Sequence, residues 1–260
     1  MAEYRYTGLL NFCASITSNT LVNFKQNGNI QDIIENVSEY FGHQWLNNIK
    51  KTNINLTPDI ILNILQLDHI GSPNKTRFMI NNTSILLSPT TVRFIYVSLD
   101  ILNHIKNLNL NNLDIIEIGG GYGAQLAFIA LLSPLYDITI NSYTILDIPQ
   151  VNNLQNLYLE KARTYIKLPE YTCTTLDDYK QQSNSNSLLI SNYALGEFNK
   201  SWQDRYIYLV VAYISHAYMI WNFSPETPNI HEYFLDKNIN IRDEDPQGNC
   251  PPIKTKIITY

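Results

Sequence analysis

The pattern of apolar and polar positions along the chain changes near residue 113. Before that point apolar residues recur three and four positions apart, as in residues 30–37 and 60–65, which is typical of helices that bury one face. A longer helix of the same period is predicted over residues 92–105, after hydroxyl residues that suit a helix start. No strand of convincing period occurs in residues 1–88, so we expect an N-terminal helical cap there.

Beyond residue 113, short apolar runs alternate with stretches of helical period. The runs predict strands at residues 114–118, 138–146, 171–175, 187–191 and 218–222, and the stretches predict helices at 123–132, 149–165 and 202–216. Such alternation is typical of a parallel sheet with helices on both faces. The tail, from residue 239 to residue 260, is interpreted as two antiparallel strands around the turn-rich EDPQGNCPP. We therefore predict an α/β fold over residues 89–260, with a mostly parallel, Rossmann-like sheet and an antiparallel C-terminal hairpin.

Composition and charge narrow the choice of partners. The 260 residues are 45% hydrophobic with a net charge of -5, and no basic run exceeds Lys50-Lys51, so we expect no nucleic acid partner. The three cysteines are far apart and odd in number, which favours a reducing cytoplasm over a disulfide framework or a zinc site. Neither a basic leader nor a long uninterrupted apolar segment indicates export or a membrane. A homo-oligomer is compatible with the sequence.

The most informative stretch is LDIIEIGGGYGAQ at residues 113–125, a short strand followed by a glycine-rich turn. Glycine has no Cβ, so such a turn lets the backbone approach a ligand closely, and the helix that follows offers N–H groups to an anionic group. Gly119-x-Gly121-x-x-Ala124 also satisfies the dinucleotide fingerprint of nicotinamide enzymes. The turn alone therefore leaves two classes of ligand open.

Two carboxylates favour one class over the other. Glu117 lies two residues before the first glycine, where a carboxylate would repel a phosphate but stabilise a cationic amino group. A dehydrogenase needs its ribose-binding acid about 20 residues on, at the end of the second strand. Asp137 is near that distance but precedes the strand, whereas Asp147 ends it in TILDIPQ, 28 residues after Gly119. A ligand with an amino-acid end and an adenosine end, such as S-adenosylmethionine, fits better than NAD. The structural alternatives are that Glu117 orders its own turn and that Asp147 caps the next helix.

The order of these motifs resembles that of class I S-adenosylmethionine-dependent methyltransferases, which place E-x-G-x-G-x-G after one strand and an acid after the next. More narrowly, EIGGGYGAQ, ILDIPQVNNLQNLYL and ISNYALGEF, followed by a long helix and YMIWN, are similar to the sugar O-methyltransferase family. The resemblance spans residues 88–260 and implies the class I methyltransferase sheet. The sequence departs from the family at Ala124, where relatives have glycine, and at Leu195-Gly196, where we expect a bulkier pair. The second departure leaves the substrate open.

The resemblance implies roles for residues near the strand ends. Leu176 and Asp177 would lie beside the adenine, although Asp177-Asp178 also suits a helix start. Arg93 would contact the cofactor carboxylate or lie at the edge of the core. The predicted cofactor-binding residues are Glu117, Gly119, Gly120, Gly121, Gly123, Asp147, Ile148, Leu176, Asp177, Asn192 and Arg93.

Residues 191–197 would lie where the transferred methyl group emerges. Methyl transfer to a hydroxyl is an in-line displacement in which the alcohol oxygen loses its proton as it attacks. Glu197 is the first candidate base and His231 the second, while Asn192 and Tyr193 would orient the acceptor or the cofactor. The alternatives are a helix-start carboxylate for Glu197 and a structural histidine. The aromatic rings near predicted strand ends are candidates for stacking on a sugar, without a choice among them; they are Tyr122, Tyr193, Trp202 and Trp221.

These observations predict an S-adenosylmethionine-dependent O-methyltransferase that acts on a sugar hydroxyl, whether the sugar is free, nucleotide-linked or glycan-attached. The alternatives are an O- or N-methyltransferase of another small molecule, a nicotinamide-dependent dehydrogenase and a binding module without turnover. No metal is predicted, because the acidic run Asp243-Glu244-Asp245 is interpreted as a solvated turn.

Overall fold

The computed structural model describes residues 2–180, 186–223, 234, 237–247 and 254–260. Two compact units make up the chain. The first comprises residues 1–106, 121–138 and 149–168, and the second comprises residues 107–120, 139–148 and 169–260. Each unit is made of several separate segments of the chain, whereas the predicted boundary at residue 88 is a single cut. The units therefore do not test that boundary, which stays a prediction.

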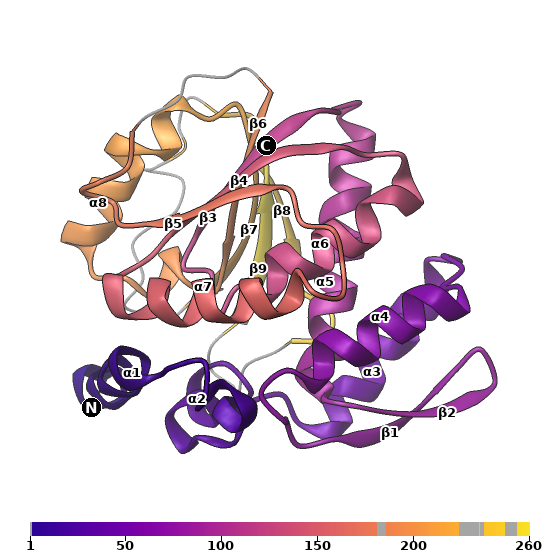
Figure 1. Ribbon diagram of the computed structural model, residues 1–260. Helices are drawn as coiled ribbons and strands as arrows, with labels where there is room; N and C mark the ends of the chain where they lie inside the picture. Colours follow the sequence, from indigo (N-terminus) through magenta and orange to yellow (C-terminus); the bar gives the residue numbers. More distant parts are fainter. Residues whose placement is uncertain (1, 181–185, 224–233, 235–236, 248–253) are drawn as a thin grey trace. The chain divides into compact units, whose positions relative to one another are not determined.

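The second unit contains a seven-stranded sheet (Figure 1). Its strands, in the order in which they pair, are β5 (Glu170–Thr174), β4 (Ile140–Leu146), β3 (Leu113–Ile118), β6 (Ser187–Asn192), β7 (His216–Phe223), β9 (Lys254–Thr259) and β8 (Asn240–Asp243). The pairs from β5 to β7 are parallel, whereas β9 runs antiparallel to both of its neighbours. The predicted mostly parallel sheet with antiparallel C-terminal strands is confirmed.

Strand β3 lies where the strand order reverses. The chain moves outward from β3 through β4 to β5 on one side and returns to form β6 on the other. In open α/β sheets ligands bind beyond the carboxyl ends of the strands at such a switch point. The register places Glu117 of β3 opposite Ile145 of β4 and Ile190 of β6. The glycine turn therefore starts at the position of the sheet where a ligand is expected.

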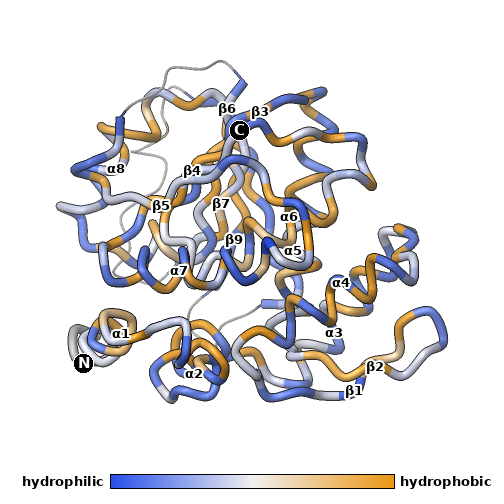
Figure 2. Tube along the Cα trace, viewed as in Figure 1, coloured by the Kyte–Doolittle hydropathy of each residue, from blue (hydrophilic) through white to orange (hydrophobic). Residues whose placement is uncertain are grey.

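One face of this sheet packs against helix α8 (Lys200–Leu209). Side chains of alternate positions on the central strands form a buried cluster with Tyr206 and Val210 at the end of this helix, and Figure 2 shows the hydrophobic colouring of these central strands. Asn199 caps the helix by accepting a hydrogen bond from the Trp202 N–H at 3.1 Å. The predicted helix over 202–216 is too long, because Val210 leaves helical geometry and a short turn, η4 (Val211–Tyr213), follows.

The second unit also contains the short helix η3 (Leu195–Glu197), and the other described helices belong to the first unit. They are α1 (Ala2–Ser15), η1 (Leu21–Gln26), α2 (Gly28–Ile33), α3 (Glu39–Lys51), α4 (Pro58–His69), α5 (Pro89–Asn107), α6 (Ala124–Leu132), η2 (Ser133–Tyr136) and α7 (Pro149–Ala162). Helix α4 shows why they form where the sequence predicts: Thr57 caps it by accepting from the Ile60 N–H, and Pro58 occupies its first turn.

A β-hairpin in this unit contradicts the prediction of no strand before residue 88. Strands β1 (Thr76–Ile80) and β2 (Thr83–Leu87) pair antiparallel. The hairpin turns at Asn81 and Asn82, whose φ angles of 49° and 60° are those of the two-residue turn that matches strand twist. Its period of two is hidden in the sequence, because Met79 and Leu86 are apolar although they are about half exposed.

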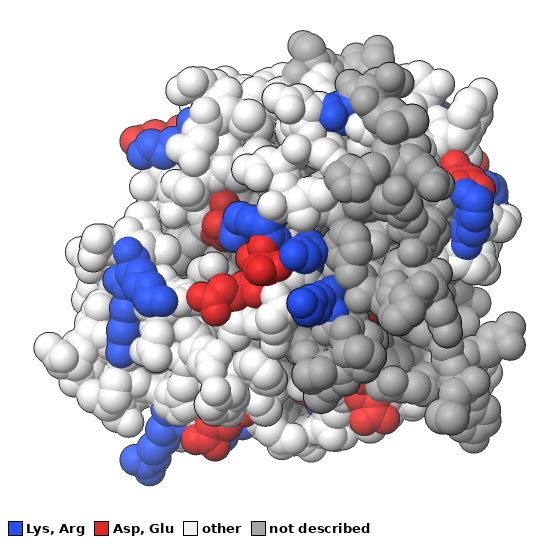
Figure 3. Space-filling view, turned by 180° about the vertical axis from the view of Figure 1, so that it is seen from behind, with Lys and Arg blue, Asp and Glu red and all other residues white. Residues whose placement is uncertain are grey.

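The described helices and one face of the molecule were compared with what a membrane span or a phosphate backbone would need. Among the described residues, no helix is both long and apolar enough to cross a membrane. On the face drawn in Figure 3, basic side chains lie next to acidic ones in small groups. Binding of nucleic acid normally uses a continuous basic surface. The expectation of no nucleic acid partner stays a prediction.

Candidate functional site

The glycine turn after β3 uses backbone angles that other residues disfavour. Gly119, Gly121 and Gly123 have φ angles of +73°, +54° and +91°, which glycine adopts without the penalty that a Cβ imposes. Gly123 occupies the position before helix α6 and has no side chain with which to cap it. The first N–H groups of a helix need acceptors, so a ligand can supply them at such a turn.

The start of the turn is fixed by the neighbouring strand ends. The Gly119 N–H donates to the Leu146 carbonyl oxygen at 3.0 Å, so the turn lies beside the end of β4. A Cβ on Gly119 would overlap the Cβ of Ala194, which follows β6. The absence of a side chain at Gly119 thus lets three strand ends converge.

We expect Gly119→Ala to destabilise the protein, because it combines a disfavoured φ angle with the overlap at Ala194. Such strain costs about 1–3 kcal/mol and should lower the melting temperature by several degrees. Adding Ala194→Gly should recover part of the loss, since it removes the overlap but not the φ strain. Thermal unfolding of the two variants measures both effects; a single variant as stable as the wild type would contradict this account of the turn.

Glu117 is a buried carboxylic acid beside this turn. Glu117 is 2% exposed, and the Tyr143 hydroxyl donates a hydrogen bond to its Oε2 at 2.9 Å. Burial raises its pKa to about 8; the Tyr143 hydrogen bond opposes the rise and the nearby charge of Asp147 adds to it. A Cβ on Gly120 would lie 3.2 Å from the same Oε2 and 2.6 Å from Ile145. Glycine at 120 therefore makes room for the acid.

Asp147 follows β4 directly and lies at the same edge of the sheet as the glycine turn. Its N–H donates to the Thr174 carbonyl oxygen at 3.0 Å, and its Oδ1 accepts from the Ile148 N–H at 2.9 Å. The residue is partly exposed, and Ile148 beside it is 41% exposed. A carboxylate and an apolar side chain are thus presented next to each other at the end of the second strand.

The residues predicted beside an adenine lie in different surroundings. Leu176 is buried in the cluster that packs against α8. The Asp177 carboxylate is exposed and forms an ion pair at 2.5 Å with Arg205, which belongs to α8. Asp178 forms a local turn, in which its Oδ2 accepts from the Thr175 hydroxyl at 2.7 Å. Arg205 could not be predicted from sequence, because its pairing with Asp177 depends on how α8 packs.

Tyr193 and Glu244 form a pair that corrects the interpretation of the acidic run as a solvated turn. Tyr193 has a φ angle of +62°, and its hydroxyl donates to Glu244, which is 2% exposed. The Glu244 N–H donates to the Thr255 carbonyl oxygen, which fixes this residue beside β9. The two aspartates of the run are exposed as predicted, and Asp243 pairs with Lys256 at the surface.

The candidate base Glu197 is exposed and accepts a hydrogen bond from a neighbouring strand. Its Oε1 accepts a hydrogen bond from the Asn222 side chain, and its N–H donates to the Ala194 carbonyl oxygen. The packing explains why glycine stands at 196 in the pair Leu195-Gly196, where a bulkier pair was expected. A Cβ at this position would lie 3.1 Å from the Trp221 ring. Asn192 ends β6, and His231 lies outside the described residues.

No family model matches this sequence, and no curated protein matches it. Among solved structures, the magnesium protoporphyrin IX methyltransferase of Synechocystis PCC 6803 is 13% identical, with a TM-score of 0.46 over 65% of this chain and 79% of that one. A candidate RNA methyltransferase from Pyrococcus horikoshii is 11% identical, with a TM-score of 0.45 over 63% and 80%. An O-methyltransferase family protein from Burkholderia thailandensis is 13% identical, with a TM-score of 0.41 over 64% and 57%.

The strand order of the sheet, with its last strand inserted antiparallel between β7 and β8, identifies the fold. It is the class I methyltransferase fold. The arrangement supplies a glycine turn and an acid on adjacent strand ends, which is what the sequence predicts for this fold.

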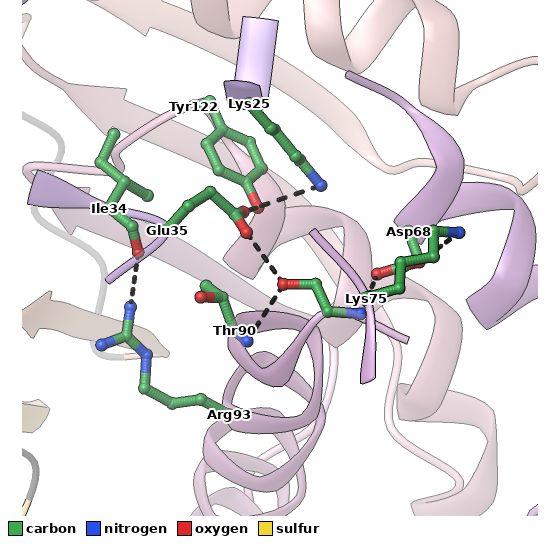
Figure 4. A network of polar contacts seen from close by, with 9 residues as sticks. Lys25, Ile34, Glu35, Asp68, Lys75, Thr90, Arg93 and Tyr122 are labelled. Atoms are coloured by element: carbon green, nitrogen blue, oxygen red, sulfur yellow. Dashed lines mark hydrogen bonds and ion pairs between the residues drawn. The ribbon is translucent and has the colours of Figure 1, made fainter. Parts of the chain in front are cut away.

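Three predicted residues belong to surroundings that the sequence did not indicate. The Arg93 guanidinium donates to the Ile34 carbonyl oxygen at 3.2 Å (Figure 4). The rings of Tyr122 and Trp221 are fully buried. A buried ring offers no face to a sugar, so these two drop out of the four aromatic candidates.

Proposed function

We propose that the protein is an S-adenosylmethionine-dependent methyltransferase that methylates a sugar hydroxyl. The observation that supports it most is the 3.0 Å hydrogen bond from the Gly119 N–H to the Leu146 carbonyl oxygen, since Leu146 precedes Asp147. That bond brings the glycine turn and the carboxylate to one edge of the sheet at its switch point.

The proposed cofactor needs three kinds of group, and this edge of the sheet offers them. Asp147 would accept hydrogen bonds from both ribose hydroxyls, and Glu117 would stabilise the ammonium of the methionine part. Gly119 and Gly120 give the turn a bare backbone that a ligand can approach, since the space that a Cβ would need is taken by Ala194, Ile145 and Glu117. Ile148 would lie against the adenine, as its exposed apolar side chain permits. Bound there, the cofactor would supply an activated methyl group.

On the acceptor side, residues 192–197 would bind the sugar and take its proton. Glu197 has a carboxylate at the surface, oriented by Asn222, which suits a general base. Tyr193 is held by Glu244 and would orient the acceptor together with Asn192. His231 remains the second candidate base. The sugar itself is proposed from the resemblance of the three sequence motifs.

Calorimetry with S-adenosylhomocysteine and with NADH tests the class of cofactor. We expect heat of binding with the first ligand only, because the acid that ends the second strand, Asp147, lies 28 residues after Gly119, whereas a dehydrogenase needs it after about 20. Binding of NADH alone would support a dehydrogenase instead. Incubation with S-adenosylmethionine and a panel of nucleotide-linked deoxysugars, analysed by mass spectrometry for the gain of one methyl group, then tests the acceptor. Methylation of a different class of small molecule would refute the sugar while preserving the methyltransferase.

We expect Glu197→Gln to lower turnover by about 100-fold, the usual contribution of a general base. Glu160→Gln is a matched control, since Glu160 is an exposed glutamate on α7 whose loss should leave turnover within about twofold of the wild type. His231→Ala is assayed beside it. Wild-type turnover in both Glu197→Gln and His231→Ala would exclude the two candidate bases.

A further inference from the structure

A buried polar network in the first unit centres on Glu35, at the end of the segment that contains α2 (Figure 4). The Glu35 side chain is 5% exposed and the Lys25 side chain 1% exposed, and the distance between Lys25 Nζ and Glu35 Oε1 is 3.8 Å. A buried charge needs a partner and hydrogen bonds. Glu35 therefore occupies a site that the surrounding structure specifies closely.

The two carboxylate oxygens of Glu35 bind different parts of the unit. Oε1 accepts a hydrogen bond of 2.6 Å from the hydroxyl of Tyr122, and Oε2 accepts one of 2.9 Å from the hydroxyl of Ser88. Tyr122 is the residue that interrupts the glycines of the turn, whereas Ser88 directly precedes α5. One carboxylate thus holds both the glycine turn and a helix start.

The Tyr122 ring is held as firmly as its hydroxyl. Lys25 Nζ lies 4.8 Å from the centre of the ring, at the distance of a cation–π contact. The rings of Phe24 and Tyr158 pack edge-on against it, at centroid distances of 5.2 Å and 4.9 Å. Burial raises the pKa of Tyr122 well above its usual value, so the hydroxyl stays protonated and remains a donor to Glu35.

Gly121, which directly precedes Tyr122, is also supported by neighbouring side chains. A Cβ on Gly121 would lie 3.7 Å from the Ile34 side chain, so Ile34 lies against the turn at van der Waals distance from that position. The Gln155 side chain donates to the Gly121 carbonyl oxygen at 3.0 Å, and Arg93 holds the Ile34 carbonyl oxygen. Residues 34 and 35 together therefore support the second half of the turn.

A glycine-rich turn needs such support more than other turns do. Glycine loses more conformational freedom on folding than any other residue. When a ligand orders a mobile turn, the entropy that the turn loses reduces the free energy of binding. A turn that is already fixed binds the ligand more tightly. The contacts of Tyr122 fix the turn before any ligand arrives.

We propose that Glu35 is a positioning residue for the cofactor: through Tyr122 it holds the glycine turn in its binding conformation, so that residues 21–35 of the N-terminal segment form part of the cofactor site's support. This inference rests on the proposed function, and it assigns to these residues a role that the sequence did not suggest.

The test compares Tyr122→Phe with Ser88→Ala. Each variant removes one hydroxyl hydrogen bond to Glu35, but only the first removes the bond to the glycine turn. Both should lower the melting temperature by a few degrees, since each loses a buried hydrogen bond to a charged group. In calorimetry with S-adenosylhomocysteine, Tyr122→Phe should bind about tenfold more weakly than the wild type, and Ser88→Ala within about twofold.

Hydrogen exchange gives a second measure that does not depend on stability alone. At a temperature where all three proteins are folded, the amides of residues 119–123 should exchange faster in Tyr122→Phe than in Ser88→Ala. Equal affinities and equal exchange in the two variants would overturn the positioning role and leave the proposed function intact. A wild-type protein that does not bind S-adenosylhomocysteine would overturn the proposed function, and this inference with it.

Discussion

Replacing Asp147 with alanine is expected to weaken the binding of S-adenosylhomocysteine by about 100-fold or more. The proposed contact consists of two hydrogen bonds from ribose hydroxyls to one carboxylate, and bonds to a charged group contribute about 1.5–3 kcal/mol each. Losing both removes at least about 3 kcal/mol, and every 1.4 kcal/mol is a factor of ten in affinity. Calorimetry at constant pH and salt measures the change.

Asp137→Asn is the control for this experiment. Asp137 precedes β4, as Asp147 follows it, and the substitution removes the same charge from an exposed residue. Its φ angle of 57° suits asparagine, so the fold should not change. Affinity should stay within about twofold of the wild type, because a screened surface charge contributes little. Loss of affinity in Asp137→Asn together with full affinity in Asp147→Ala would assign the ribose to the position expected for a dehydrogenase.

The centre of the sheet was predictable from sequence because strands β3 and β6 are buried on both faces. Such strands consist of almost continuous apolar residues, as DIIEI and SLLIS do, and every residue of β3 is buried. The switch point follows once the glycine turn is located, because ligand-binding turns of this kind follow the first strand of the sheet. The insertion of β9 between β7 and β8 depends on pairing between distant segments and left no local pattern.

The roles of Tyr122 and Glu244 could not be predicted for a related reason. Tyr122 binds Glu35, which lies 87 residues earlier in the chain, and Glu244 binds Tyr193, which lies 51 residues earlier. Sequence periodicity reports which face a residue occupies, but not which distant side chain it meets. Local composition was misleading for Glu244, since two exposed aspartates flank it. A large aromatic residue among the glycines is a local signal for Tyr122. Stacking of its ring on a sugar does not fit the structure, because the ring is buried.

The pH dependence of ligand binding should reveal whether Glu117 contacts the cofactor. With a pKa of about 8, Glu117 is mostly protonated at pH 7 in the free protein. A ligand ammonium beside it favours the carboxylate, so binding should release a proton. Affinity for S-adenosylhomocysteine should then rise about tenfold per pH unit between pH 6 and pH 8. Calorimetry in two buffers with different ionisation enthalpies detects the released proton directly.

Glu117→Gln separates this linkage from the other effects of burial. Because burial raises the folded-state pKa from 4.5 to about 8, the acid stabilises the protein fully below pH 4.5, and this stabilisation is lost as the pH rises through 8. Glutamine has no charge to bury and still accepts a hydrogen bond from Tyr143. Relative to the wild type, the variant should therefore gain unfolding free energy as the pH rises from 4.5 to 8, on the order of 5 kcal/mol in total.

The same variant should bind S-adenosylhomocysteine with an affinity that does not change between pH 6 and pH 8, because no proton is exchanged on binding. Stability and affinity thus respond in opposite directions to one substitution: the protein becomes harder to unfold at pH 8 and binds the ligand more weakly there. A carboxylic acid that served only to order its own turn would show the stability effect without the loss of affinity. A pH-independent affinity in the wild type would mean that the ligand ammonium does not lie beside Glu117. Asp147 would then be the acid that recognises the ligand.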